Sequence, residues 1–198
     1  MHISFDLDGT IIDSLDSVKN SFQRALKINH VETKKEIIVG PPLDSLVSTH
    51  VGDNAHLRRL VRNSFMKEYD ENFAITAKLY SGVECVLRSF MKSNNVISLV
   101  TNKRRIPTHK ILKQLNLIDI FDLVICSDEY EYGSSKSERL LNIRLKDTDN
   151  IYIGDTQEDC IAAKKAHYKF LGVAWGYGNI SNSAMVRSPH EIEKYVNG

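Results

Sequence analysis

Two aspartates near the amino end have the spacing of a catalytic pair. Asp6 and Asp8 end a short run of strand-forming residues, Ile3–Asp6, and are followed at once by Gly9-Thr10. At the carboxyl end of a buried strand, one carboxylate can act as a nucleophile and the other can carry a proton, with a divalent ion between them. Asp and Gly are also common in ordinary turns. The pair therefore predicts a catalytic site only if other polar groups converge on it.

Three further polar motifs follow later strand-like runs. They are Thr101-Asn102, Lys136 in a polar loop before a helical pattern, and Asp155 with Asp159 in a Gly-Asp-Thr-Gln-Glu-Asp segment. Taken singly, the first is an ordinary strand exit, the lysine a solvated side chain, and Asp155 a helix N-cap. Open parallel sheets, however, bind ligands at the carboxyl ends of their strands. The joint placement of these residues therefore predicts one shared site.

Phosphoryl transfer is the chemistry that fits these residue types. We expect Asp6 to attack phosphorus and form an aspartyl-phosphate. Asp8 would give a proton to the leaving oxygen and later take one from the attacking water. Thr101, Asn102 and Lys136 would bind the phosphoryl group and neutralise its charge.

An oxygen-liganded metal is the expected cofactor. Mg²⁺ prefers carboxylates, water and phosphate oxygens, which Asp6, the backbone carbonyl of Asp8, and Asp155 can supply. Asp159 lies one helical turn further on and would orient metal-bound water. Lys103 competes with Lys136 for the phosphate, but we expect its ammonium to point along the rim of the site, where salt screens it.

An α/β fold can position these groups. Five apolar runs predict strands, and helical patterns separate the last four. Such alternation predicts right-handed crossovers and a parallel sheet covered on both faces. The runs are Ile3–Asp6, Val96–Thr101, Leu123–Ser127, Ile151–Asp155 and Phe170–Ala174.

The long stretch between the first two strands predicts a small all-helical insert. Apolar residues from Leu15 to Leu26 share one helix face, and those from Leu57 to Phe73 indicate a second, longer helix with Asp53 as its N-cap. Gly40-Pro41-Pro42 breaks the region in the middle. We expect residues 14–78 to form a cap domain, and residues 1–13 with 79–198 to form the α/β core.

Composition excludes several classes of protein. The chain of 198 residues carries 26 basic and 25 acidic side chains, and no basic run interleaved with aromatics indicates nucleic-acid binding. No apolar stretch approaches a membrane span, and no basic leader precedes the first charge. Three widely spaced cysteines favour free thiols in a reducing, cytoplasmic compartment. The expected partner is a small-molecule phosphate ester, and the oligomeric state stays open.

These motifs resemble those of the haloacid dehalogenase superfamily. The resemblance rests on Asp6-Leu7-Asp8-Gly9-Thr10, Thr101, Lys136 and the segment from Gly154 to Asp159. It implies a Rossmann-like core of five parallel strands in the order five-four-one-two-three, with a mobile helical cap inserted after strand one.

Two further segments narrow the resemblance. Val39–Leu43 and Trp175–Gly178 resemble the phosphoglycolate-phosphatase-like branch. This implies that Gly40 and Pro41 belong to a substrate-facing cap loop, although a plain interhelix turn is an equal alternative. Trp175 itself is expected to be part of the turn out of the last strand. The family lysine is often followed by proline, whereas Lys136 is followed by Ser137.

The resulting hypothesis is a Mg²⁺-dependent phosphatase acting on a small phosphate monoester. A sugar-phosphate mutase of the same fold would keep both aspartates, and its cap would hold a bisphosphate while excluding water. A non-enzymatic phospho-acceptor signalling or regulatory module also combines Asp, Thr, Lys and Mg²⁺ on a parallel sheet. In a signalling receiver, however, the acceptor aspartate follows the acidic pair, whereas here the nucleophile candidate comes first.

Overall fold

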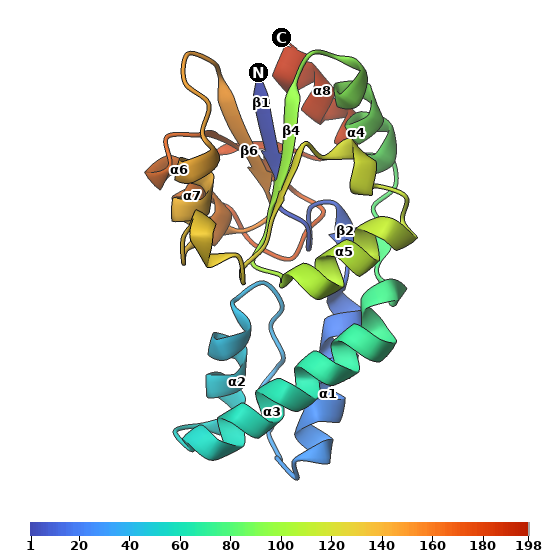
Figure 1. Ribbon diagram of the computed structural model, residues 1–198, viewed down its shortest axis with the longest axis vertical. Helices are drawn as coiled ribbons and strands as arrows, with labels where there is room; N and C mark the ends of the chain where they lie inside the picture. Colours follow the sequence, from blue (N-terminus) through green and yellow to red (C-terminus); the bar gives the residue numbers. More distant parts are fainter. Residues whose placement is uncertain (198) are drawn as a thin grey trace.

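The computed structural model describes residues 1–197. Its main sheet has six parallel strands in the order β5-β4-β1-β6-β7-β8 (Figure 1). The strands are β1 (His2–Phe5), β4 (Val96–Val100), β5 (Leu123–Ile125), β6 (Asn150–Gly154), β7 (Lys169–Val173) and β8 (Ala184–Val186). The α/β class and the predicted order of the first five strands are confirmed.

The sheet has one strand more than the predicted five. β8 is a run of only three residues, with Ser183 before it and Arg187 after it. Such a short run gives no periodic signal along the chain. It becomes a strand because it pairs with β7.

Helices cover both faces of the sheet. Figure 1 shows α6 and α7 on one side and α4, α5 and α8 on the other. Side chains alternate between these faces, as the pleat requires: Ile151 and Ile153 join one apolar cluster, and Tyr152 joins the other. The helices are α4 (Val83–Lys92), α5 (Arg105–Gln114), α6 (Lys136–Ile143), α7 (Gln157–Lys165) and α8 (Pro189–Asn197), with short 3₁₀ turns at Ile118–Ile120 and Tyr130–Tyr132.

A buried polar network occupies the amino end of the central strands. The Nε2 atom of His2 lies 2.8 Å from Ser98 Oγ, and its Nδ1 lies 3.1 Å from Asn150 Oδ1. Ser4 Oγ lies 2.6 Å from Ser98 Oγ. These hydrogen bonds pair polar groups that burial would otherwise leave unsatisfied. They also join β1 to both of its neighbours, β4 and β6.

Residues 14–78 form a helical segment that lies beyond the carboxyl edge of the sheet (Figure 1). The chain leaves the sheet through β2 (Ile12–Asp13) and returns through β3 (Lys78–Leu79), and these two strands pair antiparallel. Between them come α1 (Leu15–Ile28), α2 (Leu43–Val51) and α3 (Ala55–Glu68), then a π-helical turn (Tyr69–Phe73) and a 3₁₀ turn (Ala74–Thr76). The rings of Phe22 and Phe65 pack edge to face, with centroids 5.9 Å apart, and join α1 to α3.

Two details of this segment differ from the sequence-based prediction. α2 was not predicted, because its sequence is rich in Ser, Thr and Val, which are modest helix formers. The N-cap of α3 is Asn54 and not Asp53: Asn54 Oδ1 accepts a hydrogen bond from Leu57 N at 3.0 Å. Asp53 instead pairs with Arg58 at 2.7 Å.

Among residues 1–197, no helix combines the length and the apolar character needed to cross a membrane. The three cysteines are free thiols, as the sequence predicted.

Candidate active site

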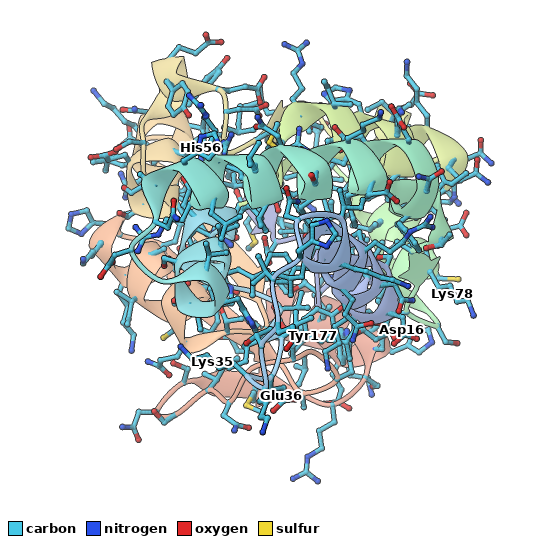
Figure 2. The ribbon with its side chains drawn as sticks, turned by 90° about the horizontal axis from the view of Figure 1, so that it is seen from below. Asp16, Lys35, Glu36, His56, Lys78 and Tyr177 are labelled. Atoms are coloured by element: carbon cyan, nitrogen blue, oxygen red, sulfur yellow. The ribbon has the colours of Figure 1, made fainter. Side chains whose placement is uncertain are left out.

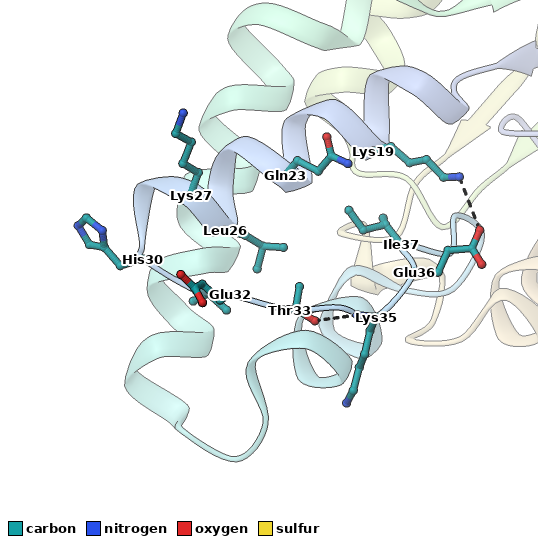
Figure 3. Close-up of a pocket in the computed structure, with 11 residues that line it drawn as sticks. Lys19, Gln23, Leu26, Lys27, His30, Glu32, Thr33, Lys35, Glu36 and Ile37 are labelled. Carbon is teal, nitrogen blue, oxygen red and sulfur yellow. Dashed lines mark hydrogen bonds and ion pairs between the residues drawn. The ribbon is translucent and has the colours of Figure 1, made fainter.

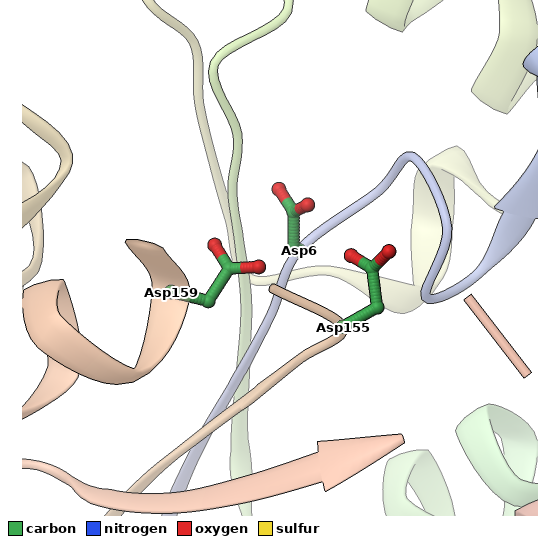
Figure 4. Close-up of side chains that lie close together, drawn as sticks. All are labelled: Asp6, Asp155 and Asp159. Carbon is green, nitrogen blue, oxygen red and sulfur yellow. The ribbon is translucent and has the colours of Figure 1, made fainter. Parts of the chain in front are cut away.

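Three carboxylates converge at the carboxyl edge of the sheet. Asp6 follows β1, Asp155 follows β6, and Asp159 projects from the first turn of α7 (Figure 4). All three are buried, and each offers an oxygen within 4.8 Å of the others. We call these three residues the carboxylate cluster. Parallel strands end at the same edge, so residues far apart in sequence meet here.

Crowding and burial make this cluster costly to keep ionised. Burial, together with the negative charges of the neighbouring carboxylates, raises the pKa of Asp6 to about 8, although the Lys136 ammonium acts to lower it. Burial likewise raises the pKa of Asp155 to about 6. A divalent cation would offset the repulsion, since it favours the ionised carboxylates. The all-oxygen donor set fits a hard cation, so the cluster can hold a metal ion.

Lys136 neutralises part of this charge. Its Nζ donates to Asp6 Oδ1 at 3.0 Å and to Asp159 Oδ1 at 2.6 Å, and its side chain is only 9% exposed. A capping box fixes the start of α6: the Ser135 hydroxyl accepts from Glu138 N, and the Glu138 carboxylate accepts from Ser135 N. Lys136 is therefore held at the first position of the helix although no proline follows it.

Asp8 has a different set of partners. Its Oδ1 accepts from Lys103 Nζ at 3.0 Å and from the Ser14 hydroxyl. The sequence-based expectation that Lys103 points along the rim is wrong, because its side chain is only 8% exposed. Its ammonium also donates to the hydroxyl of Tyr69, at 2.9 Å. Tyr69 comes from the helical segment, and no pattern in the sequence links it to Lys103.

Thr101 and Asn102 lie at the end of β4, beside the carboxylate cluster. Thr101 is 1% exposed, and its Oγ1 accepts from Lys103 N at 3.2 Å. Asn102 Oδ1 accepts from the guanidinium of Arg139 at 2.8 Å. Thr101 and Asn102 both line a cavity of about 360 Å³ that Asp6, Asp8 and Lys136 also line.

The helical segment contributes the other wall of this cavity. Gly40 and Pro41 line it, and a Cβ on Gly40 would lie 3.8 Å from the Thr156 methyl carbon. Of the three arginines of α3, Arg62 lines the cavity and pairs with Asp44 at 3.0 Å. The predicted substrate-facing loop therefore lies opposite the catalytic candidates. The cavity lining does not include Arg58 or Arg59.

Comparison with known proteins shows the family. The sequence model of the haloacid dehalogenase-like hydrolase family matches residues 3–173 of this chain. The chain belongs to this family. Phosphoglycolate phosphatases of Neisseria meningitidis and Aquifex aeolicus are 26% and 27% identical to this hydrolase over 201 and 196 aligned residues. The alignments cover 90% and 91% of this chain and 82% and 87% of those proteins.

A solved structure shows the same fold. A haloacid dehalogenase-like family hydrolase from Streptococcus pneumoniae superposes with a TM-score of 0.86 at 23% identity, over 98% of this chain and 97% of that one. The predicted family, the enzyme class of hydrolase, and the α/β fold with a helical insertion after the first strands are thus confirmed. The two relatives of this haloacid dehalogenase-like hydrolase named above are both phosphatases.

A loop after β7 completes the site of the hydrolase. Tyr177 N donates to Asp155 Oδ2 at 2.7 Å, and Trp175 Nε1 donates to the Thr10 carbonyl at 3.1 Å. A Cβ on Gly176 would lie 2.2 Å from the Asp155 Cβ atom. Trp175 lies in the turn out of β7, as the sequence predicted, and it is not among the residues that line the cavity. Only the Trp-Gly-Tyr-Gly pattern signalled this loop, because its partner carboxylate lies about twenty residues earlier.

A second cavity of this hydrolase, about 660 Å³, lies away from the carboxylate cluster, between α1 and the loop that follows it (Figure 3). Lys19 and Glu36 pair across it at 4.0 Å. Seen from the helical end, Lys35 and Glu36 lie on this loop, while α3 crosses the molecule with His56 near its beginning (Figure 2). The residues that line this cavity include no member of the carboxylate cluster, nor Asp8 or Lys136.

Proposed function

We propose that this protein is a Mg²⁺-dependent phosphatase that hydrolyses a small phosphate monoester through an aspartyl-phosphate on Asp6. The observation that carries the proposal is the separation of two aspartates two residues apart into different environments. Asp6 lies in the carboxylate cluster with Lys136, whereas Asp8 bonds to Lys103 and Ser14. Two carboxylates with distinct surroundings can take distinct roles.

The first half of the reaction forms the covalent intermediate. A carboxylate oxygen of Asp6 attacks phosphorus, the bond to the ester oxygen breaks, and Asp8 gives that oxygen a proton. Lys136 and the Thr101–Asn102 turn bind the phosphoryl oxygens and stabilise their charge. In the second half, water attacks phosphorus, Asp8 accepts its proton, and the Asp6 carboxylate is released with inorganic phosphate.

The cofactor proposal follows from the same residues. Asp6, Asp155 and the Asp8 carbonyl would hold Mg²⁺, which supplies positive charge that lowers the repulsion between nucleophile and substrate. One Asp159 oxygen accepts from the Lys136 ammonium at 2.6 Å, and the other accepts from both the N–H and the hydroxyl of Thr156. The two Asp155 oxygens accept only from neutral donors, Tyr177 N and the Thr10 hydroxyl. This favours a role for Asp159 in orienting metal-bound water and not in direct coordination.

We propose that residues 14–78 are a cap domain over a core of residues 1–13 and 79–198. The paired strands β2 and β3 mark the two crossings between these parts. A cavity of about 360 Å³ between the Gly40–Pro41 loop and the catalytic candidates is of a size that suits a small ligand. The first substrate to test is phosphoglycolate, because related proteins carry that activity in their names.

The experiment is a phosphate-release assay on a panel containing phosphoglycolate, sugar phosphates, a nucleoside monophosphate and a folded phosphoprotein. We expect release from small esters only, loss of activity with chelator, recovery with Mg²⁺, and inhibition by Ca²⁺. Rapid-quench labelling should show acid-stable phosphoenzyme in the wild type and none in Asp6→Asn. Asp8→Asn should turn over on the order of 10²–10⁴-fold more slowly.

Several outcomes would overturn the proposal. Labelled Asp6→Asn protein, or full activity after exhaustive chelation, would refute the assigned nucleophile or metal. Transfer of the label to another hydroxyl of the substrate instead of to water would identify a mutase. Equal activity on the phosphoprotein would argue against a cap that restricts substrate size.

A further inference from the structure

Arg139 is a buried cation without an anionic partner. Its side chain is 1% exposed, it projects from the fourth residue of α6, and it lines the cavity of the catalytic candidates. Within residues 1–197, no carboxylate lies within 4.0 Å of it. Each of the other four cationic side chains in the cavity wall has such a carboxylate: Lys136 has Asp6, Lys103 has Asp8, Arg62 has Asp44, and Arg104 has Asp70.

The contacts of Arg139 leave part of its binding capacity unused. Its Nη2 donates to Asn102 Oδ1 at 2.8 Å and to the Thr101 carbonyl at 3.5 Å, and its Nη1 donates to the Ser134 carbonyl at 3.3 Å. Its Nε is buried and has no hydrogen-bond partner in the described chain. An uncompensated buried charge is costly. The fold therefore keeps this cation for a purpose other than its own stability.

The contact with Asn102 has a directional consequence. A guanidinium can only donate hydrogen bonds, so the amide oxygen of Asn102 must face it. The amide nitrogen then faces the opposite way, and no acceptor among residues 1–197 takes a hydrogen bond from it. Because Asn102 lines the same cavity, this nitrogen is available as a donor to a ligand.

A phosphoryl group would satisfy both features. It carries up to two negative charges and several acceptor oxygens, which can use a fixed N–H donor and a nearby positive charge. Burial lowers the pKa of Arg139, while the charge of Asp6 acts to raise it. The guanidinium nevertheless stays protonated in proteins, so its charge is present at every working pH.

We propose that Arg139 is a positioning residue for phosphate binding: it turns the Asn102 amide nitrogen into the cavity and places an unpaired positive charge behind the Thr101–Asn102 turn. This inference rests on the proposed phosphatase function. It adds to that function a residue that acts through its neighbour and does not itself take part in bond making.

The test is calorimetric titration of orthovanadate and of inorganic phosphate into the Mg²⁺-loaded protein. Arg139→Met should bind both anions at least about tenfold more weakly, the effect expected from losing a charge-assisted hydrogen-bond arrangement. The affinity of Arg139→Lys for these anions should lie between those of the wild type and Arg139→Met, because lysine keeps the positive charge without the planar guanidinium. The matched control is Arg144→Met at the other end of α6, which should bind as the wild type does.

A double-mutant cycle separates positioning from general support of the fold. If Arg139 acts through Asn102, the loss in Asn102→Ala and the loss in Arg139→Met should not add in the double variant. Asn102→Asp should change stability and binding in opposite directions. It supplies a carboxylate for Arg139 and should therefore raise the midpoint of thermal unfolding. Its negative charge should weaken vanadate binding at least tenfold, roughly the scale of one charged contact.

The outcomes distinguish the two proposals. A wild-type protein that binds neither anion and hydrolyses no ester refutes the proposed function, and this inference falls with it. If the wild type and Arg139→Met bind vanadate equally tightly, the inference alone is refuted. Fully additive losses in the double-mutant cycle would refute it as well. If Arg139→Met does not fold, the comparison of Arg139→Lys and Asn102→Asp with the wild type decides the question.

Discussion

Without a bound metal ion, the protein should lose stability as the pH rises from 6.5 to 8. Burial and neighbouring carboxylates raise the pKa of Asp6 from 3.8 to about 8. In this interval the folded state holds a proton on Asp6 that the unfolded state has already released. Stability falls with rising pH wherever the folded state binds more protons than the unfolded state does. The stability that comes from the proton on Asp6 is therefore lost as the pH rises through the folded-state pKa.

The size of the loss follows from the same numbers. One extra proton in the folded state costs about 1.4 kcal/mol of stability per pH unit. Because protonation of Asp6 declines to about half by pH 8, the loss between pH 6.5 and 8 integrates to about 1.6 kcal/mol.

The assay is urea denaturation with chelator present, followed by the fluorescence of Trp175, the one tryptophan in the chain. Asp6→Asn is the matched control, since an amide does not titrate, and the wild-type loss is taken relative to this variant. Saturating Mg²⁺ should remove the loss, because it binds the folded state with its carboxylates ionised. If the stability of the wild type and that of Asp6→Asn show the same dependence on pH, the assignment of a proton to Asp6 is refuted.

Three other perturbations have definite expected outcomes. In steady-state kinetics, Lys136→Ala should lower kcat/KM by at least ~10²-fold and Lys103→Ala by about tenfold or more. Each substitution removes the buried partner of one catalytic aspartate. An unchanged kcat/KM in Lys103→Ala would contradict this expectation. Gly176→Ala should weaken Mg²⁺ binding in calorimetry, since its Cβ would lie 2.2 Å from an atom of the carboxylate cluster, whereas Gly52→Ala, with nothing within 4 Å, should not. Burial lowers the pKa of His2 below 6.5, so the unfolded state takes up its proton first and stability should fall as the pH drops below 6.5. His2→Gln should flatten this dependence in urea denaturation, and an equally steep fall in that variant would count against it.

The sequence predicted the groups that local pattern and strand order bring together. Asp6 and Asp155 each end an apolar run, and a parallel sheet must carry both to one edge. Lys136 was predicted from its place before a helical pattern, and the structure brings it to Asp6 at 3.0 Å. The period of each element and the alternation predicted a parallel sheet, whereas the order of its strands was implied by the resemblance to the haloacid dehalogenase superfamily.

The sequence could not predict partners that come from a different part of the chain. Lys103 was expected to be exposed because its neighbours are basic, but Tyr69 of the helical segment covers it. Arg139 looks like a surface residue of a short helix, but the folded chain buries it beside the Thr101–Asn102 turn that follows β4. Such contacts depend on how helices pack on the sheet, which periodicity does not encode.

The hydrogen-bonded network at the amino end of β1 has a consequence for the opposite end of the strand. Side chains alternate along a strand, so a slip of β1 by one residue would put Leu7 where Asp6 now lies. His2, Ser4 and their partners on β4 and β6 fix this alignment from a point four residues, roughly 13 Å, away from the nucleophile. A substitution such as Ser98→Val could therefore abolish turnover without touching the substrate. Loss of activity after mutation at this end of the sheet would measure how accurately the strands are aligned.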